Sequence, residues 1–198
     1  QVTIDRERAL ALGLPLGEIT SALQIFLGSQ YVNDFEFNNR AYRVYVQADA
    51  DWTANKRVSH LWRARADGTE AVQLTFGSEG ESRPRWSPDG ASMAFVARRE
   101  GAEHAQIHLL PTGGGEARPL TAHATAVGDP AWSPDGRFVY FLAADPKPAE
   151  QIAREKARDD VYAFDENFHQ RHLWKVDVAT RAETRVTSGD FSVLSYEL

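Results

Sequence analysis

The chain has 198 residues, with 22 basic and 28 acidic side chains, a net charge of −6, and no cysteine. This length is enough for a packed core, while the absence of cysteine excludes disulfides and thiolate metal sites. Lys and Arg are not clustered, which argues against a nucleic-acid partner. No apolar stretch approaches the roughly 20 residues that cross a bilayer, and we expect no membrane span and no signal peptide.

Composition changes near residue 52, which predicts two parts, 1–52 and 53–198. The first part contains one proline and one tryptophan, and the second contains the other eight prolines and four tryptophans. In the first part we expect a small α/β segment in the order β-α-α-β-β. Its predicted elements are a strand at 1–5, helices at 6–12 and 16–28, and strands at 31–37 and 40–47 joined by Asn38-Asn39.

The second part is repetitive. Trp86-Ser-Pro-Asp-Gly90 recurs 46 residues later as Trp132-Ser-Pro-Asp-Gly136, and Leu74-Thr75 recurs at the same interval as Leu120-Thr121. A third copy, displaced by 112 residues from the first, places His172-Leu-Trp174 on His60-Leu-Trp62. Periods of this length with strand-turn-strand patterns are typical of β-propeller blades.

The predicted fold is therefore mainly β: an incomplete propeller of about two and a half four-stranded blades after the α/β segment. We expect blades at about 59–98, 105–144 and 171–198, with a helical insertion at 145–170. The strands of the first blade are predicted at 59–65, 71–75, 82–86 and 92–97. The third blade would lack its last strand, which predicts an open hydrophobic edge, marginal stability and self-association.

The two Ser-Pro-Asp-Gly segments are interpreted as structural turns. Pro sets φ for the first turn position, Asp accepts a backbone hydrogen bond, and Gly supplies a positive φ. The residues assigned to these turns are Trp86, Ser87, Pro88, Asp89 and Gly90, and Trp132, Ser133, Pro134, Asp135 and Gly136.

No residue is predicted to be catalytic, to bind a cofactor or to ligate a metal. Ser92 lacks the Gly-x-Ser-x-Gly context of a hydrolase nucleophile, and Gly113-Gly-Gly115 is better explained as a hairpin turn than as a phosphate loop. The tryptophan pairs 62/174 and 86/132 are expected in the core. The acidic residues 159, 160, 165 and 166 suit a solvated loop or, alternatively, a cation or amine site. The six histidines lack ligand spacing: His60, His104, His108, His123, His169 and His172.

Residues 1–52 resemble the periplasmic porter and docking region of resistance-nodulation-division (RND) efflux transporters of the acriflavin-resistance type. The family implies proton-driven drug export, but its transmembrane helices and proton-relay carboxylates are absent from this sequence. The resemblance depends on Val2-Thr-Ile-Asp5, Ala11-Leu-Gly-Leu-Pro15, Leu27-Gly-Ser-Gln-Tyr-Val-Asn-Asp-Phe35 and Asn39-Arg-Ala-Tyr-Arg-Val-Tyr-Val-Gln-Ala-Asp49.

Residues 53–198 are similar to the N-terminal propeller of the prolyl oligopeptidase family of serine peptidases, in its acylaminoacyl-peptidase and dipeptidyl-peptidase branch. The family implies a cap that gates peptide access to a hydrolase domain, which carries the catalytic triad and is not in this sequence. The segments that carry this similarity are 55–62, 73–77, the two Trp-Ser-Pro-Asp-Gly turns, and 159–168 leading into His172-Leu-Trp174.

The expected function is therefore a non-catalytic propeller fragment fused to an efflux-transporter fragment. Its expected partners are a peptide substrate or a catalytic hydrolase domain. Two alternatives stay open: a Tol-type periplasmic interaction propeller, which shares the Trp-Ser-Pro-Asp-Gly repeat, and a fragment of a drug efflux transporter. The resemblances suggest a bacterial source, and the sequence does not choose between periplasm and cytoplasm. Segment 44–52 suits either family, which makes a crossover within a locally similar strand plausible.

Overall fold

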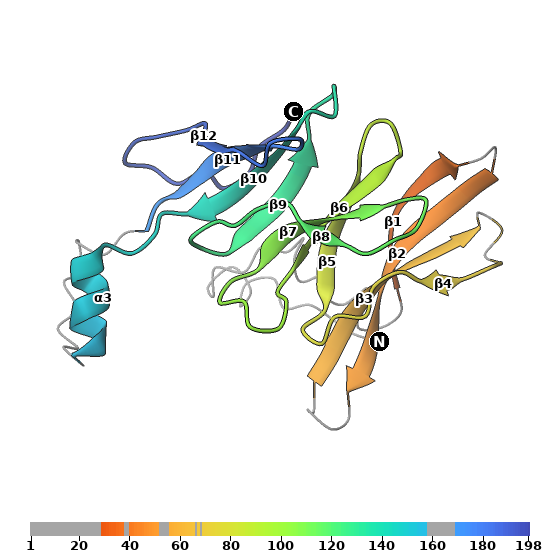
Figure 1. Cartoon of the computed structure of the whole chain (residues 1–198), viewed down its shortest axis with the longest axis horizontal. Coiled ribbons are helices and arrows are strands. Elements are labelled where there is room, and N and C mark those ends of the chain that lie inside the picture. The colour runs from red at the N-terminus through yellow and green to blue at the C-terminus, as the bar shows by residue number, and fades with distance from the viewer. Residues whose placement is uncertain (1–28, 38–39, 52–55, 66, 68, 158–168) are drawn as a thin grey trace, which may run out of the picture. The chain divides into compact units, whose positions relative to one another are not determined.

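The computed structural model describes residues 29–37, 40–51, 56–65, 67, 69–157 and 169–198. The chain divides into two compact units, Gln1–Ser82 and Arg83–Leu198, each described by itself. The described part of the chain is mainly β, with three four-stranded antiparallel sheets (Figure 1). The strand and two helices expected within 1–28 lie outside the described residues.

The first sheet has the strand order β1-β2-β3-β4. Its strands are β1 (Ser29–Phe37), β2 (Arg40–Asp51), β3 (Lys56–Arg65) and β4 (Val72–Gln73). The expected hairpin of 31–37 and 40–47 is thus present. The predicted seam between residues 52 and 53 falls between β2 and β3, which pair along ten residues of one sheet.

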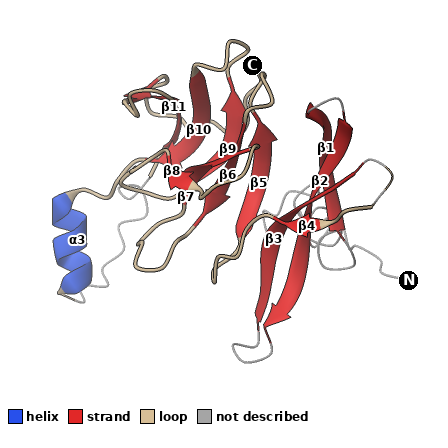
Figure 2. Ribbon diagram, turned by 45° about the vertical axis from the view of Figure 1, so that its right-hand side comes forward, coloured by secondary structure: helices blue, strands red, loops and turns tan. Residues whose placement is uncertain are grey.

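The second and third sheets belong to the second unit, except for Glu81 and Ser82 at the start of β5. Their strands are drawn as arrows in Figure 2. The second sheet has the order β5-β6-β7-β8 and the third the order β12-β11-β10-β9. Their strands are β5 (Glu81–Trp86), β6 (Ser92–Ala97), β7 (Gln106–Pro111), β8 (Arg118–Pro119), β9 (Val127–Trp132), β10 (Phe138–Ala144), β11 (Arg171–Asp177) and β12 (Glu183–Arg185).

The sheets group the strands differently from the predicted blades. The predicted blades begin at the strands equivalent to β3, whereas the sheets of the second unit begin at β5 and β9. The expected first blade, 59–98, groups β3 and β4 with β5 and β6, whereas β3 and β4 pair with β1 and β2. Likewise β11 and β12, expected to open a third blade, complete a four-stranded sheet with β9 and β10. The repeat period fixes which strands are equivalent, but only the hydrogen bonds show which four share a sheet.

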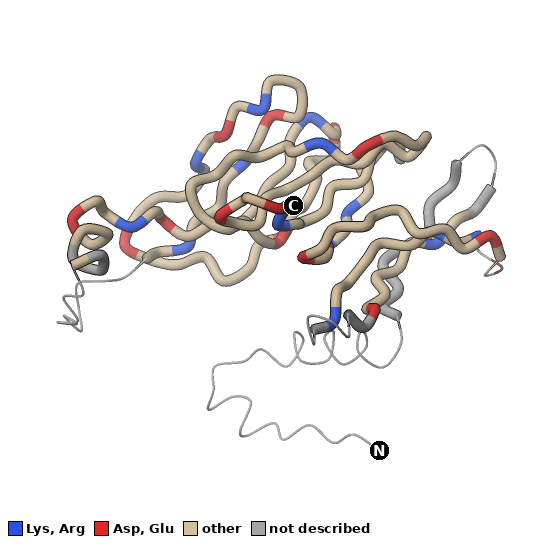
Figure 3. The backbone as a smooth tube through the Cα atoms, turned by 60° about the horizontal axis from the view of Figure 1, so that its bottom comes forward, with Lys and Arg blue, Asp and Glu red and all other residues tan. Residues whose placement is uncertain are grey.

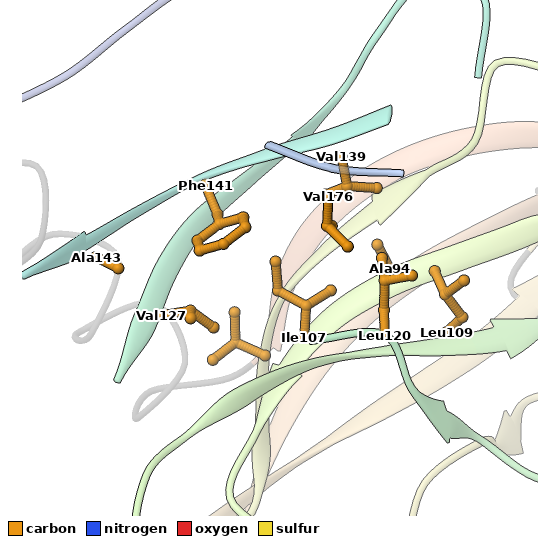
Figure 4. Packing of buried hydrophobic residues seen from close by; sticks show 10 residues of the cluster. Ala94, Ile107, Leu109, Leu120, Val127, Val139, Phe141, Ala143 and Val176 are labelled. Atoms are coloured by element: carbon orange, nitrogen blue, oxygen red, sulfur yellow. The ribbon is translucent and has the colours of Figure 1, made fainter. Parts of the chain in front are cut away.

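The two sheets of the second unit pack around one apolar core (Figure 4). Phe141, Ile107 and Val139 are fully buried there, and Trp132 and Trp174 pack at its margin. Each strand that contributes supplies at least one β-branched or aromatic residue to this core, a type that suits a half-buried pleated surface. The core residues come from both sheets: Ala94, Val96, Ile107, Leu109, Leu120, Val127, Val139, Phe141, Ala143 and Val176.

Helix α3 (Ala149–Lys156) lies within the expected insertion and stands away from the sheets of its unit (Figure 1). It interrupts the hairpin between β10 and β11, yet the register of these strands continues without a shift from Phe138↔Asp177 to Ala144↔Arg171. The insertion therefore leaves the blade intact. Among the described residues, no helix is long and apolar enough to cross a membrane.

Candidate functional site

The two Ser-Pro-Asp-Gly segments form the same hydrogen-bonded turn. In the first, Ser87 Oγ donates to Asp89 Oδ1 at 2.5 Å and accepts the N–H of Ser92 at 2.9 Å. In the second, Ser133 Oγ lies 2.5 Å from Asp135 Oδ1 and accepts the N–H of Phe138 at 2.9 Å.

The glycines of these turns take φ values of 68° and 70°, in the left-handed region that glycine favours. The serine hydroxyls are thus occupied by the turn, and the hydrogen bonds they donate lower the pKa of both aspartates. Ser92 opens strand β6 opposite Pro111, and a strand start differs from the strand-to-helix elbow of a hydrolase nucleophile. Glycines 113–115 lie in the connection between β7 and β8, where Gly114 and Gly115 have positive φ.

The histidines at the equivalent positions 60 and 172 are both engaged in blade packing. His60 Nδ1 lies 3.0 Å from Oε2 of Glu81, a carboxylate that is 1% exposed and also accepts a hydrogen bond from Thr75 Oγ1 at 2.7 Å. His172 is fully buried, with Nδ1 3.2 Å from Thr187 Oγ1. In the described ranges no three His, Asp or Glu side chains converge on a possible metal position.

A second histidine–carboxylate pair joins the two blades of the second unit. His123 Nδ1 lies 2.7 Å from Glu183 Oε2, and the N–H of Ala122 donates to Glu183 Oε1 at 2.9 Å. Burial by itself raises the pKa of Glu183, but these hydrogen bonds outweigh it and the pKa lies below its usual value. The ring of His123 packs edge-on against Trp174, with centroids 4.6 Å apart.

A charged cluster surrounds Asp129 on strand β9. Arg83 forms an ion pair with one carboxylate oxygen, and Arg171 Nη2 lies 3.2 Å from the other. Tyr196 places its hydroxyl 2.5 Å from the carbonyl oxygen of Asp129 and 2.9 Å from that of Tyr140, and burial raises its pKa well above the usual value. This cluster was not predicted from the sequence.

Elsewhere the charged residues are interspersed along the described backbone (Figure 3). The acidic residues 159, 160, 165 and 166 lie outside the described residues.

Of the predicted tryptophan pairs, 86/132 contributes a contact between strands. Trp132 donates its indole N–H to the carbonyl of Arg85 at 3.0 Å, which connects β9 to β5. The described residues thus show blade-to-blade contacts and turns.

The chain is similar to two different groups of known proteins. Residues 1–84 match the model of the AcrB/AcrD/AcrF family. The toluene efflux pump membrane transporter TtgB of Pseudomonas putida is 37% identical over 81 residues, which are 41% of this chain and 8% of the transporter. The family match therefore extends past the predicted seam and covers the whole first sheet.

A peptidase-like relative is also found. The peptidase YuxL of Bacillus subtilis is 36% identical over 74 residues, 37% of this chain and 11% of YuxL. The chain thus spans about a tenth of the length of either relative.

Solved structures show the propeller fold. The acylaminoacyl peptidase of Pyrococcus horikoshii superposes with a TM-score of 0.55 at 18% identity, covering 80% of this chain and 25% of the peptidase. The propeller of the Trilobed protease from Pyrococcus furiosus gives 0.50 at 14% identity, over 81% of this chain and 43% of that chain. TolB from Acinetobacter baumannii gives 0.53 at 19% identity, over 94% and 38%. The chain therefore joins a segment similar to RND efflux transporters to a partial propeller similar to those of prolyl oligopeptidase-family peptidases.

Proposed function

We propose that the propeller part of this chain is a non-catalytic cap segment of a peptidase of the prolyl oligopeptidase type. In this role it covers a hydrolase domain and restricts access to peptides, while cleavage depends on that other domain. The observation that carries the proposal is the use of both repeat serines, Ser87 and Ser133, as turn hydrogen-bond donors and acceptors. The similarity to a peptidase sequence and to peptidase propellers supports it.

The test is a pair of assays with the full chain. Alone, the protein should not hydrolyse acylated or free peptide p-nitroanilides above the buffer rate. Added to the separately expressed hydrolase domain of a related peptidase, it should lower kcat/KM for long peptides more than for dipeptides, since a cap excludes bulk. The turn variant Ser87→Ala serves as the matched control for the first assay. Hydrolysis by the chain alone that Ser87→Ala abolishes would contradict the proposal.

A second candidate is a Tol-type protein-interaction propeller, favoured by the TolB superposition over 94% of this chain. It predicts binding to a protein partner without any effect on a hydrolase domain. The two candidates separate in one experiment, because a cap changes the peptide-length dependence of hydrolysis and an interaction propeller leaves it unchanged. Self-association through an open sheet edge also stays a proposal, and sedimentation velocity across a hundredfold concentration range tests it.

A further inference from the structure

Three equivalent residues, one in each sheet, make the same two backbone hydrogen bonds, and they align the three sheets residue by residue. Leu61, Ile107 and Leu173 each accept, at the backbone carbonyl, an N–H from the following strand at 2.8 Å. Their own N–H groups donate to Thr75, Thr121 and Thr187 Oγ1 at 3.0, 2.9 and 3.0 Å. Strands β3, β7 and β11 are therefore equivalent at atomic level, which fixes the alignment of the strands paired to them.

The neighbouring strands β2, β6 and β10 follow from that alignment. Leu61 pairs with Val46, Ile107 with Val96, and Leu173 with Leu142. Val46, Val96 and Leu142 are all buried, with 2%, 8% and 2% exposure. The transporter-like strand β2 thus occupies the place that β6 and β10 hold in the propeller blades.

Strand β1, which pairs with β2, also matches β9, which pairs with β10, and both strands carry a one-residue β-bulge. In the third sheet, Leu142 pairs with Gly128 and Tyr140 with Ala131, so β9 carries one extra residue between these pairs. In the first sheet, the equivalent residue Val46 pairs with Gln30, and Val44 pairs with Asn33. Strand β1 has its one-residue bulge at the same step. A bulge changes the twist of a strand and re-aims its side chains, so coincidence of both register and bulge is a specific match.

Only the turn differs. Ser133 and Phe138 flank four turn residues in the third sheet, whereas Phe37 pairs directly with Arg40 in the first. The Phe35↔Tyr42 pair is equivalent to Ser133 and Phe138, and the first sheet adds two more strand pairs, Glu36↔Ala41 and Phe37↔Arg40, before its loop. The transporter-like hairpin is therefore two residues longer at its tip and otherwise matches in register. The family match through residue 84 means that β3 and β4 satisfy the transporter pattern and the blade repeat together.

We infer that the edge of β3 is a docking surface for a bulged β-hairpin, and that the transporter-like hairpin β1–β2 occupies it in place of a Trp-Ser-Pro-Asp-Gly hairpin. The first sheet is thus a hybrid blade. The transporter-like segment has a structural role in this chain: it pairs with the backbone groups of β3, which an uncovered edge strand would leave free to bind other chains. This role depends on strand pairing alone and does not require the peptidase-cap function.

Because the chain has no cysteine, engineered cysteine pairs report this pairing directly. Ala48 pairs with Ser59, whereas Arg57 lies two residues further along the same face. Directly paired Cα atoms lie about 4.5–5.5 Å apart, within disulfide range, while diagonal neighbours lie about 7–8 Å apart, beyond it. In the full chain, A48C/S59C should oxidise to an intramolecular disulfide at least tenfold faster than the matched control A48C/R57C.

A second pair of variants tests the bulge. Gln47 pairs with Ser29 only if the extra residue of β1 is present, and an unbulged hairpin would place Gln30 opposite Gln47 instead. S29C/Q47C should therefore form the disulfide and Q30C/Q47C should not, because a one-residue slip turns side chains to the opposite face.

Each outcome has a clear reading. Non-reducing electrophoresis and peptide mass spectrometry at two protein concentrations separate intramolecular from intermolecular products. Rapid monomeric A48C/S59C and S29C/Q47C disulfides support the hybrid blade. Equal rates in A48C/S59C and A48C/R57C, a preference for Q30C/Q47C, or disulfides only in dimers would overturn it, the last by making a second copy the occupant of the β3 edge.

Discussion

Asp129 and Arg83 lie at the same point of two successive repeats, 46 residues apart, and their side chains form an ion pair. Both take a left-handed backbone conformation, with φ values of 51° and 52°. Each is followed by proline, and Asp129 also accepts a hydrogen bond from Arg171 at 3.2 Å. The Asp129 carboxylate on β9 therefore contacts Arg83 on β5 of the second sheet and Arg171 on β11 of its own sheet. It links the two blades of the second unit.

The first prediction concerns the charge of Asp129. Asp129→Asn keeps a residue type that tolerates positive φ and removes the ion pairs with Arg83 and Arg171. Because these side chains are about 35–43% exposed, the loss should be modest, about 1 kcal/mol in urea unfolding.

Asp129→Val is the companion variant, since it adds backbone strain to the loss of charge. It should cost about 1–2 kcal/mol more than Asp129→Asn. Equal stability of the two variants would contradict the conformational part of this argument.

The repeat and most strands were predictable from the sequence because they depend on local signals. Leu74-Thr75, Leu120-Thr121 and Val186-Thr187 follow the last strand of each sheet, and Asp-Gly supplies the residues of the two Ser-Pro-Asp-Gly turns. The grouping of strands into sheets was not predictable, since it depends on which non-local edges pair. The expected limits place β3 with β5, but β3 pairs with β2 across the predicted seam.

The Asp129 cluster lay beyond sequence reasoning for a different reason. A residue before proline is biased towards extended conformations, so sequence rules point away from the left-handed φ of Asp129. Arg171 is 42 residues distant and follows an insertion, and no local pattern brings it to Asp129. The one available signal is that Arg83-Pro84 and Asp129-Pro130 recur at the repeat spacing.

The second prediction tests the glycine of the second turn. Gly136 has a φ of 70°, and a Cβ there would meet Pro88 Cδ at an unstrained 3.6 Å. Gly136→Ala should therefore cost about 1 kcal/mol through backbone conformation alone. Gly113→Ala is the matched control, because nothing lies within 4 Å of its Cβ and its φ is not positive. Chemical denaturation of both variants measures their free energies of unfolding. Equal losses of stability would contradict the conclusion that the turn requires glycine at position 136.

The third prediction concerns the threonine that aligns the blades. Thr121 is 3% exposed, accepts the N–H of Ile107 and donates to Gln106 Oε1 at 2.7 Å. Thr121→Val leaves the buried N–H of Ile107 without this acceptor and removes one of the two hydrogen bonds to Gln106 Oε1, which keeps the N–H of His123, and should cost about 1–3 kcal/mol. Thr121→Ser keeps the hydroxyl and should cost clearly less. A larger loss in the serine variant would show that the methyl group, and not the hydrogen bonds, stabilises this position.

The fourth prediction uses pH. Hydrogen bonds from His123 and from the N–H of Ala122 hold the pKa of Glu183 below its ordinary value of 4.5. A carboxyl group whose pKa is depressed by folding adds stability above the unfolded pKa, and that stability is lost as pH falls through the folded pKa. Glu183→Gln should thus be less stable than the parent chain at pH 7, by roughly 1–3 kcal/mol. The difference should shrink steadily below about pH 4.5.

Urea unfolding at half-unit steps from pH 7 to pH 3 measures this difference, with Glu116→Gln at an exposed position as the control for removing one negative charge. The control should follow the parent curve within about 0.5 kcal/mol throughout. If the difference in unfolding free energy between Glu183→Gln and the parent chain stayed constant from pH 7 to pH 3, the charge of the carboxylate would not contribute to stability, and only its packing would. The contact between His123 and Glu183 would then stabilise the two blades without a titrating component.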